Sequence, residues 1–149
     1  MRQLFFVKLI AVLLFGTLVL TSCKKSGHDH IDAFGMVIFD GDTQVAIQQG
    51  GTVSYTNGSH ISLEEGQVTS VMTVRFLDAD GDFIVIEDAD YFLRIQNSNP
   101  VAVNAPLVEG QSWQFRLAGL NEGESQLRFE LMHVNHADFR SQPFIVVVQ

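Results

Sequence analysis

Residues 125–133, Ser-Gln-Leu-Arg-Phe-Glu-Leu-Met-His, carry the clearest structural signal of the sequence. Apolar side chains occupy every second position, at Leu127, Phe129 and Leu131, and charged side chains lie between them. This two-residue period is that of a β-strand with one face buried and the other in solvent. The stretch therefore predicts a strand that contributes one face to a hydrophobic core.

The same alternation recurs in two other segments, so several strands can share that core. It is found at Met72, Val74 and Phe76 and at Trp113, Phe115 and Leu117. No window after Phe34 keeps the 3.6-residue period of a helix. We therefore expect an all-β domain of two antiparallel sheets packed face to face. The expected strands are residues 34–39, 44–48, 52–56, 60–63, 68–77, 83–86, 91–96, 101–103, 112–117, 125–133 and 144–148.

The loop Asn57-Gly58-Ser59 predicts a hairpin between the strands on either side of it. A three-residue loop pairs Tyr55 with Ile61 and keeps the apolar side chains of both strands on one face. In this register His60 points outward beside the turn.

The N-terminal residues have the features of a cleaved export signal. Arg2 gives the start of the chain a positive charge, and no charged residue interrupts residues 9–20. A membrane-spanning helix needs roughly 20 apolar residues, so this shorter run fits a signal peptide better than a permanent transmembrane helix.

Leu20-Thr21-Ser22-Cys23 ends this segment with the single cysteine of the protein. These residues resemble the lipobox of bacterial lipoproteins, in which the cysteine receives a diacylglycerol and becomes the new N-terminus. The resemblance implies a signal peptide over residues 1–22, lipidation of Cys23 with acyl chains such as palmitate, and membrane anchoring through the lipid. Because Lys24 rather than Asp follows, it also implies the outer membrane of a bacterial cell envelope. An ordinary secretory signal with a chance cysteine is the alternative.

Cleavage before Cys23 leaves 127 residues, which suits one domain. Residues 23–32 are expected to be the lipidated cysteine and a polar tether, and residues 33–149 the domain. All 17 acidic residues but only seven basic ones lie after the cleavage point, a net charge of about minus ten with neutral histidines. Nucleic acid is therefore not an expected partner, because phosphate binding needs clustered Lys and Arg.

Residues 92–133 carry a second resemblance. The segment 97–103 (NSNPVAV) is followed by 117–125 (LAGLNEGES). These segments are similar to bacterial immunoglobulin-like domains, which place a strand, G-L-x-x-G-x-S/T and another strand near their end. The resemblance implies an immunoglobulin-like antiparallel β-sandwich, a fold used for adhesion, scaffolding and carbohydrate binding. The residues after His133 depart from the pattern and are expected to form a long extra loop and a final strand.

The spacing from Gly119-Leu120 to Phe129 is also similar to that of chagasin-type cysteine protease inhibitors. The aromatic and Arg-Pro-Trp loop motifs of those inhibitors are missing from this sequence. Protease inhibition is accordingly a further alternative function.

Two histidines and an aspartate close to the strand at residues 125–133 form the best candidate site. His133, His136 and Asp138 are expected to lie on one loop, and imidazole and carboxylate groups are ligands of zinc and copper. With His60 as a further ligand they form a candidate transition-metal site. The alternative for His133 is a hydrogen-bonded histidine at the rim of the core.

Two other groups of candidate ligands have weaker patterns. Asp78, Asp80 and Asp82 are a candidate calcium site, but their spacing does not fit the EF-hand loop, and a polar turn between strands is the alternative. His28 and His30 are expected to be solvated parts of the tether.

No motif of an enzyme is present. The sequence has no Gly-x-Ser-x-Gly elbow, phosphate loop or His-Glu-x-x-His, and its cysteine is assigned to the anchor. We therefore expect a membrane-anchored lipoprotein with a non-enzymatic binding or structural role. The alternative roles are a zinc- or copper-binding accessory in metal acquisition or homeostasis and, less specifically, a module that binds a protein or a glycan.

Overall fold

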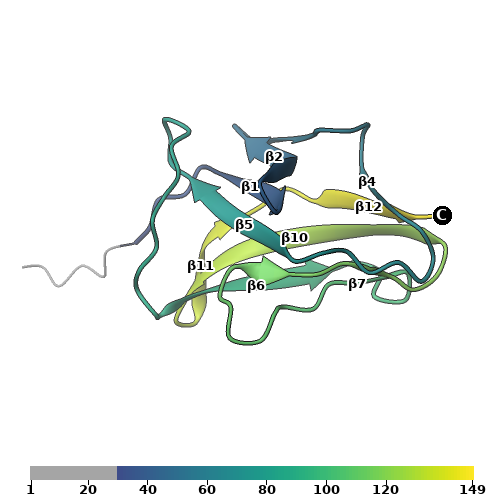
Figure 1. Ribbon diagram of the computed structural model, residues 1–149. Coiled ribbons are helices and arrows are strands. Elements are labelled where there is room, and N and C mark those ends of the chain that lie inside the picture. Colours follow the sequence, from purple (N-terminus) through teal and green to yellow (C-terminus); the bar gives the residue numbers. More distant parts are fainter. Residues whose placement is uncertain (1–29) are drawn as a thin grey trace, which may run out of the picture.

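The computed structural model describes residues 30–149, which form a β-sandwich and contain no helix (Figure 1). The first sheet has the order β3-β2-β1-β5-β8. Its strands are β1 (Gly35–Asp40), β2 (Thr43–Gln49), β3 (Thr52–Tyr55), β5 (Met72–Leu77) and β8 (Gln114–Phe115). The second sheet contains β4 (Ile61–Leu63), β6 (Tyr91–Asn97), β10 (Gly123–His133), β11 (His136–Arg140) and β12 (Phe144–Val148). The short strands β7 (Val103–Asn104) and β9 (Ala118–Gly119) pair with each other.

The signal peptide, the lipobox with Cys23 and most of the expected tether lie outside the described residues. Ordered contacts begin inside that tether. Ile31 and Ala33 are partly buried against the core, so the packed part of the chain starts close to the predicted domain boundary at residue 33.

Strand β10 is the centre of the second sheet. It pairs with β6 along one edge, and along the other edge with β12 over its first half and with β11 over its second half. In the first sheet β5 lies between β1 and β8. These are the neighbour relations of strands C, F and G and of strands A, B and E in the immunoglobulin fold. The predicted all-β, immunoglobulin-like sandwich is therefore confirmed, with β12 and β4 as its parallel pair.

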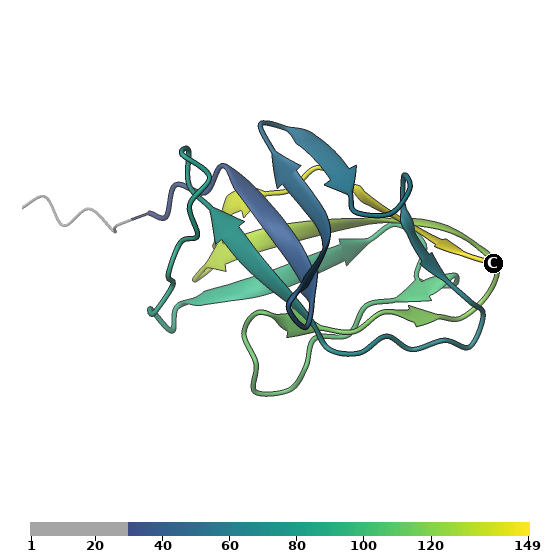
Figure 2. The ribbon, with the colours of Figure 1, turned by 45° about the horizontal axis from the view of Figure 1, so that its top comes forward.

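The two sheets enclose one hydrophobic core, in which the predicted alternation is confirmed. In Figure 2 the blue strands of the first sheet lie in front of the yellow-green strand β10. Leu127, Phe129 and Leu131 on β10 are completely buried. The ring of Phe129 contacts Phe115 of the first sheet and Phe144 of β12, with centroids 5.2 and 5.4 Å apart. All fully buried members of this core lie between residues 36 and 148, so the domain is packed without the N-terminal segment.

The predicted hairpin around residues 57–59 is wrong. β3 pairs with β2 in the first sheet, whereas β4 pairs with β12 in the second, so the chain crosses between the sheets here. Tyr55 still turns toward the interior, where its hydroxyl accepts a hydrogen bond from the Ile145 amide at 2.6 Å. The alternation of apolar residues fixes which face of a strand is buried, but it does not say which strand lies beside it.

The remaining differences concern short or irregular segments. Residues 83–86 do not form a strand, although Phe83 makes an isolated bridge to Leu77. The strands expected at 101–103 and 112–117 are reduced to the two-residue strands β7 and β8. Strand β11, in contrast, occupies a segment that was expected to be a loop.

Glu130 lies on the outer face of the second sheet, as the alternation predicts, yet its side chain is completely buried. Arg94 on β6 and Arg140 on β11 are its direct cross-strand neighbours, and both guanidinium groups bond to its carboxylate. Burial alone raises the pKa of Glu130, but the two arginines outweigh burial and hold the pKa below its usual value. The three side chains thus tie three strands together across the sheet.

We expect the Glu130→Gln variant to lower the free energy of unfolding at pH 7 by about 1–3 kcal/mol, because both guanidinium groups lose a charged partner. Because the pKa of Glu130 is lower in the folded than in the unfolded protein, the carboxylate contributes its full stabilisation at pH values above the unfolded pKa. This stabilisation is lost as the pH falls through the pKa of the folded state. Urea unfolding at pH 7 and pH 3 measures both effects. Glu109→Gln, at an exposed loop position, is the matched control, and equal losses in the two variants would contradict the prediction.

Candidate metal centre

The segment from His133 to Asp138 is a β-hairpin and not the loop that the sequence suggested. His133 is the last residue of β10 and His136 the first of β11, and the two are a direct cross-strand pair joined by a two-residue turn. Paired residues in antiparallel strands direct their side chains to the same face of the sheet. The hairpin therefore holds both imidazoles on one side, with ring centroids 5.4 Å apart.

A β-bulge in β11 brings Asp138 to the same place. Leu131 pairs with Phe139 but Met132 pairs with Ala137, which leaves Asp138 as the extra residue. A bulge bends the strand and changes the direction of a side chain, and bulges are frequent near functional sites. Here it allows Phe139 to enter the core while the carboxylate of Asp138, only 3% exposed, faces the histidines.

The turn itself is strained. Val134 has a φ of +53°, the one positive φ among the described residues other than glycine. A β-branched side chain in this region is a genuine outlier, and such strain is concentrated at functional sites. The amide of Val134 donates to the carbonyl of Asp90 at 3.0 Å, which fixes the turn against the segment before β6.

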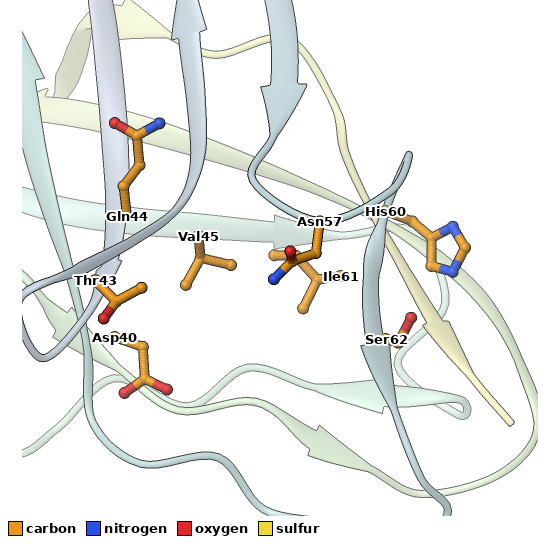
Figure 3. Close-up of a pocket in the computed structure, with 8 residues that line it drawn as sticks. All are labelled: Asp40, Thr43, Gln44, Val45, Asn57, His60, Ile61 and Ser62. Atoms are coloured by element: carbon orange, nitrogen blue, oxygen red, sulfur yellow. The ribbon is translucent and has the colours of Figure 1, made fainter.

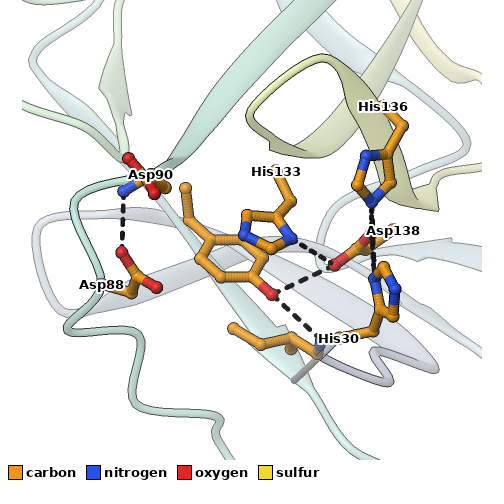
Figure 4. A network of polar contacts seen from close by, with 8 residues as sticks. His30, Asp88, Asp90, His133, His136 and Asp138 are labelled. Carbon is orange, nitrogen blue, oxygen red and sulfur yellow. Dashed lines mark hydrogen bonds and ion pairs between the residues drawn. The ribbon is translucent and has the colours of Figure 1, made fainter. Parts of the chain in front are cut away.

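His30 completes the group from the other end of the chain. It precedes β1, and its Nδ1 lies 3.2 Å from Asp138 Oδ1 and 3.4 Å from His136 Nε2 (Figure 4). The next residue, Ile31, donates its amide hydrogen to the hydroxyl of Tyr91 at 3.2 Å. A residue that was expected to be solvated is thus placed against the hairpin.

The ligand atoms of His30, His136 and Asp138 have a spacing that fits a small divalent cation. His30, His133, His136 and Asp138 each offer one ligand atom, and the four atoms lie within 4.8 Å of one another. His136 Nε2 is 2.9 Å from Asp138 Oδ1, which with the two distances from His30 gives a triangle of 2.9, 3.2 and 3.4 Å. A tetrahedral zinc with bonds of about 2.0–2.1 Å requires edges of about 3.3–3.4 Å.

The hydrogen bonds within this triangle depend on which imidazole nitrogens carry protons. If both imidazole nitrogens donate to Asp138 Oδ1, the two N–H groups of His30 and His136 face each other across 3.4 Å. A cation within the triangle accepts the lone pairs of all three atoms at once. The same three atoms can form a hydrogen-bonded cluster or coordinate one metal ion.

Tyr91 contacts two of the candidate ligands, Asp138 and His133. Its hydroxyl donates to Asp138 Oδ2 at 3.1 Å, and its ring stacks on that of His133 with centroids 4.3 Å apart and planes inclined by 8°. His133 is 5% exposed, as the inward phase of β10 predicts, and its Nδ1 is 3.8 Å from Asp138 Oδ2. Such outer contacts orient metal ligands.

The electrostatics of Asp138 favour its charged form. Burial alone raises its pKa, but hydrogen bonds from His30 and Tyr91 outweigh burial, and the pKa lies below its usual value. Tyr91 shows the opposite effect, since burial and the neighbouring carboxylate raise its pKa. Near neutral pH the group therefore offers an ionised carboxylate and a tyrosine that remains a hydrogen-bond donor.

His60 does not belong to this group, contrary to the candidate set drawn from the sequence. Its neighbour Ile61 pairs with Val146, which in turn pairs with Ser125. Ser125 lies eight residues before His133 on β10, which corresponds to about 26 Å. His60 instead lines a cavity of about 490 Å³. Figure 3 shows it with the other residues of that lining. Asp40, Thr43, Gln44, Val45, Asn57, Ile61 and Ser62 form the rest of its lining.

The aspartates at residues 78–82 form a turn. Asp78 Oδ1 accepts the backbone amides of Asp80 and Asp82 at 3.0 and 2.9 Å, and the Asp78 amide donates to the Asp82 carbonyl at 3.0 Å. Asp78 therefore uses a carboxylate oxygen within its own turn. The candidate metal groups among residues 30–149 do not include these three aspartates, whereas Asp88 and Asp90 do lie within reach of His133.

Comparisons with known proteins assign no family to this chain. No known protein family matches the sequence, and no curated protein matches it. Among solved structures, domains 4 and 5 of the S-layer protein SbsC are similar, with a TM-score of 0.43 and 13% sequence identity. The match covers 68% of this chain and 61% of that one, so less than two thirds of that structure is spanned. Residues 30–149 contain no helix that could cross a membrane.

Two members of the site could not be chosen from the sequence pattern. Tyr91 is the first residue of a predicted strand and lies in phase with the buried positions of that strand. Its contact with Asp138 therefore could not be predicted from the alternation. His30 has no periodic neighbours at all. The sequence places His28-Asp29-His30 just before the first strand. This position indicates a site only when it is known at which end of the sandwich the first strand begins.

We expect the Val134→Asn variant to stabilise the domain by about 1 kcal/mol, because asparagine tolerates a positive φ and the valine side chain is exposed. The gain corresponds to a rise in Tm of about 3–5 °C. Thermal unfolding followed by circular dichroism, with a metal chelator present, measures it. Val101→Asn replaces an exposed valine without a positive φ and should give no such gain. An unchanged or lower Tm for Val134→Asn would contradict the strain argument.

Proposed function

We propose that this protein binds a divalent transition metal, zinc or copper(II), through His30, His133, His136 and Asp138. The observation that supports this proposal is the triangle of 2.9, 3.2 and 3.4 Å between ligand atoms of His30, His136 and Asp138. His133 lies beside that triangle, with all four ligand atoms within 4.8 Å of one another. The proposed role is binding rather than catalysis.

The donor set favours particular metals. Three imidazoles and one carboxylate suit zinc and copper(II), whereas thiolate or thioether ligands, which copper(I) prefers, are not part of the group. Calcium and magnesium prefer sites made of oxygen ligands. The exposed imidazoles of His30 and His136, 55% and 47% exposed, leave the site open to ions from solution.

The lipobox resemblance supplies the cellular setting of the proposal. A lipidated Cys23 would anchor the protein in the envelope, in the outer membrane, where the domain would act as an accessory in metal acquisition or homeostasis. The negative net charge of the chain fits this role, because an acidic surface attracts cations.

Isothermal titration of the chain from residue 24 with zinc and with copper(II) tests the proposal. This chain retains the complete core. We expect one ion to bind with micromolar or lower Kd, and the His133→Ala/His136→Ala variant to weaken binding at least 100-fold. His60→Ala is the matched control and should bind like the unaltered chain. Absence of binding near pH 7, or equal binding by the double variant, would overturn the metal role.

A second candidate function is supported by the cavity beside His60. It combines one carboxylate, amide and hydroxyl groups and two apolar side chains, without a lysine or arginine. Such a lining suits a neutral polar ligand such as a glycan. Screening the chain on a glycan array in the presence of chelator tests this candidate. Metal-independent binding lost in an Asn57→Ala/His60→Ala variant would support it, and no binding would remove it.

A further inference from the structure

The ligands of the proposed metal site come from two separate parts of the chain. His133, His136 and Asp138 belong to one hairpin, whereas His30 precedes β1 and lies more than 100 residues away in the sequence. An ion bound by all four residues would therefore connect the N-terminal segment to the last hairpin. Figure 4 shows His30 directly against His136 and Asp138.

Besides His30, residues 30–33 are held by the partial burial of Ile31 and Ala33 against the core and by few hydrogen bonds. Ile31 donates its amide hydrogen to Tyr91, and the Ala33 amide donates back to Ile31 within the segment. The first backbone bond to the sheet follows at Phe34, whose amide donates to the Leu77 carbonyl at 2.8 Å. Asp32 is exposed, and the imidazole of His30 is 55% exposed. The contacts of His30 are thus the outermost attachment of this segment.

We propose that the bound ion is a clasp that fixes residues 30–33 onto the β10–β11 hairpin and releases them when it leaves. This inference rests on the proposed metal-binding function. The coupling follows from ligand sharing, because an ion that keeps His30 in its coordination shell also keeps the backbone of His30 at the hairpin. Tyr91 links the two parts further, since its hydroxyl bonds both to Asp138 and to the amide of Ile31.

The clasp would set how far the domain extends from a lipid at Cys23. His30 lies seven positions after Cys23, and Phe34, which makes the first backbone bond to the sheet, lies eleven positions after it. At about 3.3–3.6 Å per extended residue, the upper limit of the reach is roughly 25 Å with the clasp closed and roughly 40 Å with it open. Metal binding would thus control the position of the domain relative to the membrane.

Residue-resolved hydrogen exchange by NMR, on the chain from residue 24 with chelator or with saturating zinc, tests the clasp. We expect zinc to slow exchange of the Ile31 amide by ~10-fold or more. Exchange at Leu127 and Phe129, in the middle of β10, should change little. The His30→Ala variant should bind zinc ~10–100-fold more weakly and show no slowing at Ile31 even when saturated. The His60→Ala variant should behave like the unaltered chain.

The outcomes separate the two proposals. Zinc binding in calorimetry without slower exchange at Ile31 would overturn the clasp and leave the metal role intact. Equal zinc affinity of the unaltered chain and His30→Ala would likewise overturn the clasp, because His30 would not be a ligand. If zinc does not bind at all, the metal role fails and the clasp fails with it. Slower exchange that disappears in His30→Ala supports both.

Discussion

The pairing of β10 along both of its edges is the constraint on which the core and the candidate site depend. Its eleven residues span about 35 Å and contact β6, β12 and β11 in turn. The middle of the strand supplies Phe129 to the core, and its last residue, His133, lies at the metal group. A shift of one residue against β6 would turn both side chains to the opposite face. One register therefore determines the packing of the sandwich and the position of the site.

Two buried carboxylates on neighbouring strands show how a structural acid differs from one suited to a ligand. Burial of an unpaired charge costs several kcal/mol, so each of them needs partners. Glu130 has two guanidinium groups, which carry a permanent charge and match a carboxylate geometrically. Asp138 has imidazoles and a phenol, and imidazole both loses its proton near neutral pH and coordinates metals. The first set holds strands together, whereas the imidazoles of the second set are also possible metal ligands.

The sequence could predict what depends on local alternation and little of what depends on the arrangement of strands. The faces of β5 and β10, the fold class and the burial of His133 follow from a two-residue period. The separation of β3 from β4 does not, since either partner buries Tyr55. Strand β11 was taken for a loop because its bulge breaks the alternation at Asp138. The sequence also placed His60 in the metal site and His30 in a solvated tether, whereas the structure places His30 beside His136 and Asp138 and His60 elsewhere. A position next to a turn or within a tether does not indicate at which end of the sandwich a residue lies.

The topology explains why the N-terminal segment meets the hairpin. The start of β1 pairs with the end of β5, whose chain continues through one connection to the start of β6. There Tyr91 pairs with His133, so the entry of the chain and the β10–β11 turn lie at one end of the sandwich. Fixing each residue of the entering segment costs about 1–2 kcal/mol of conformational entropy, and a single hydrogen bond offsets about 1 kcal/mol of this. The hydrogen bonds of His30 therefore contribute about as much free energy as fixing the residue costs. In the proposed metal site, coordination bonds to a shared ion would add the free energy that holds His30 at the hairpin.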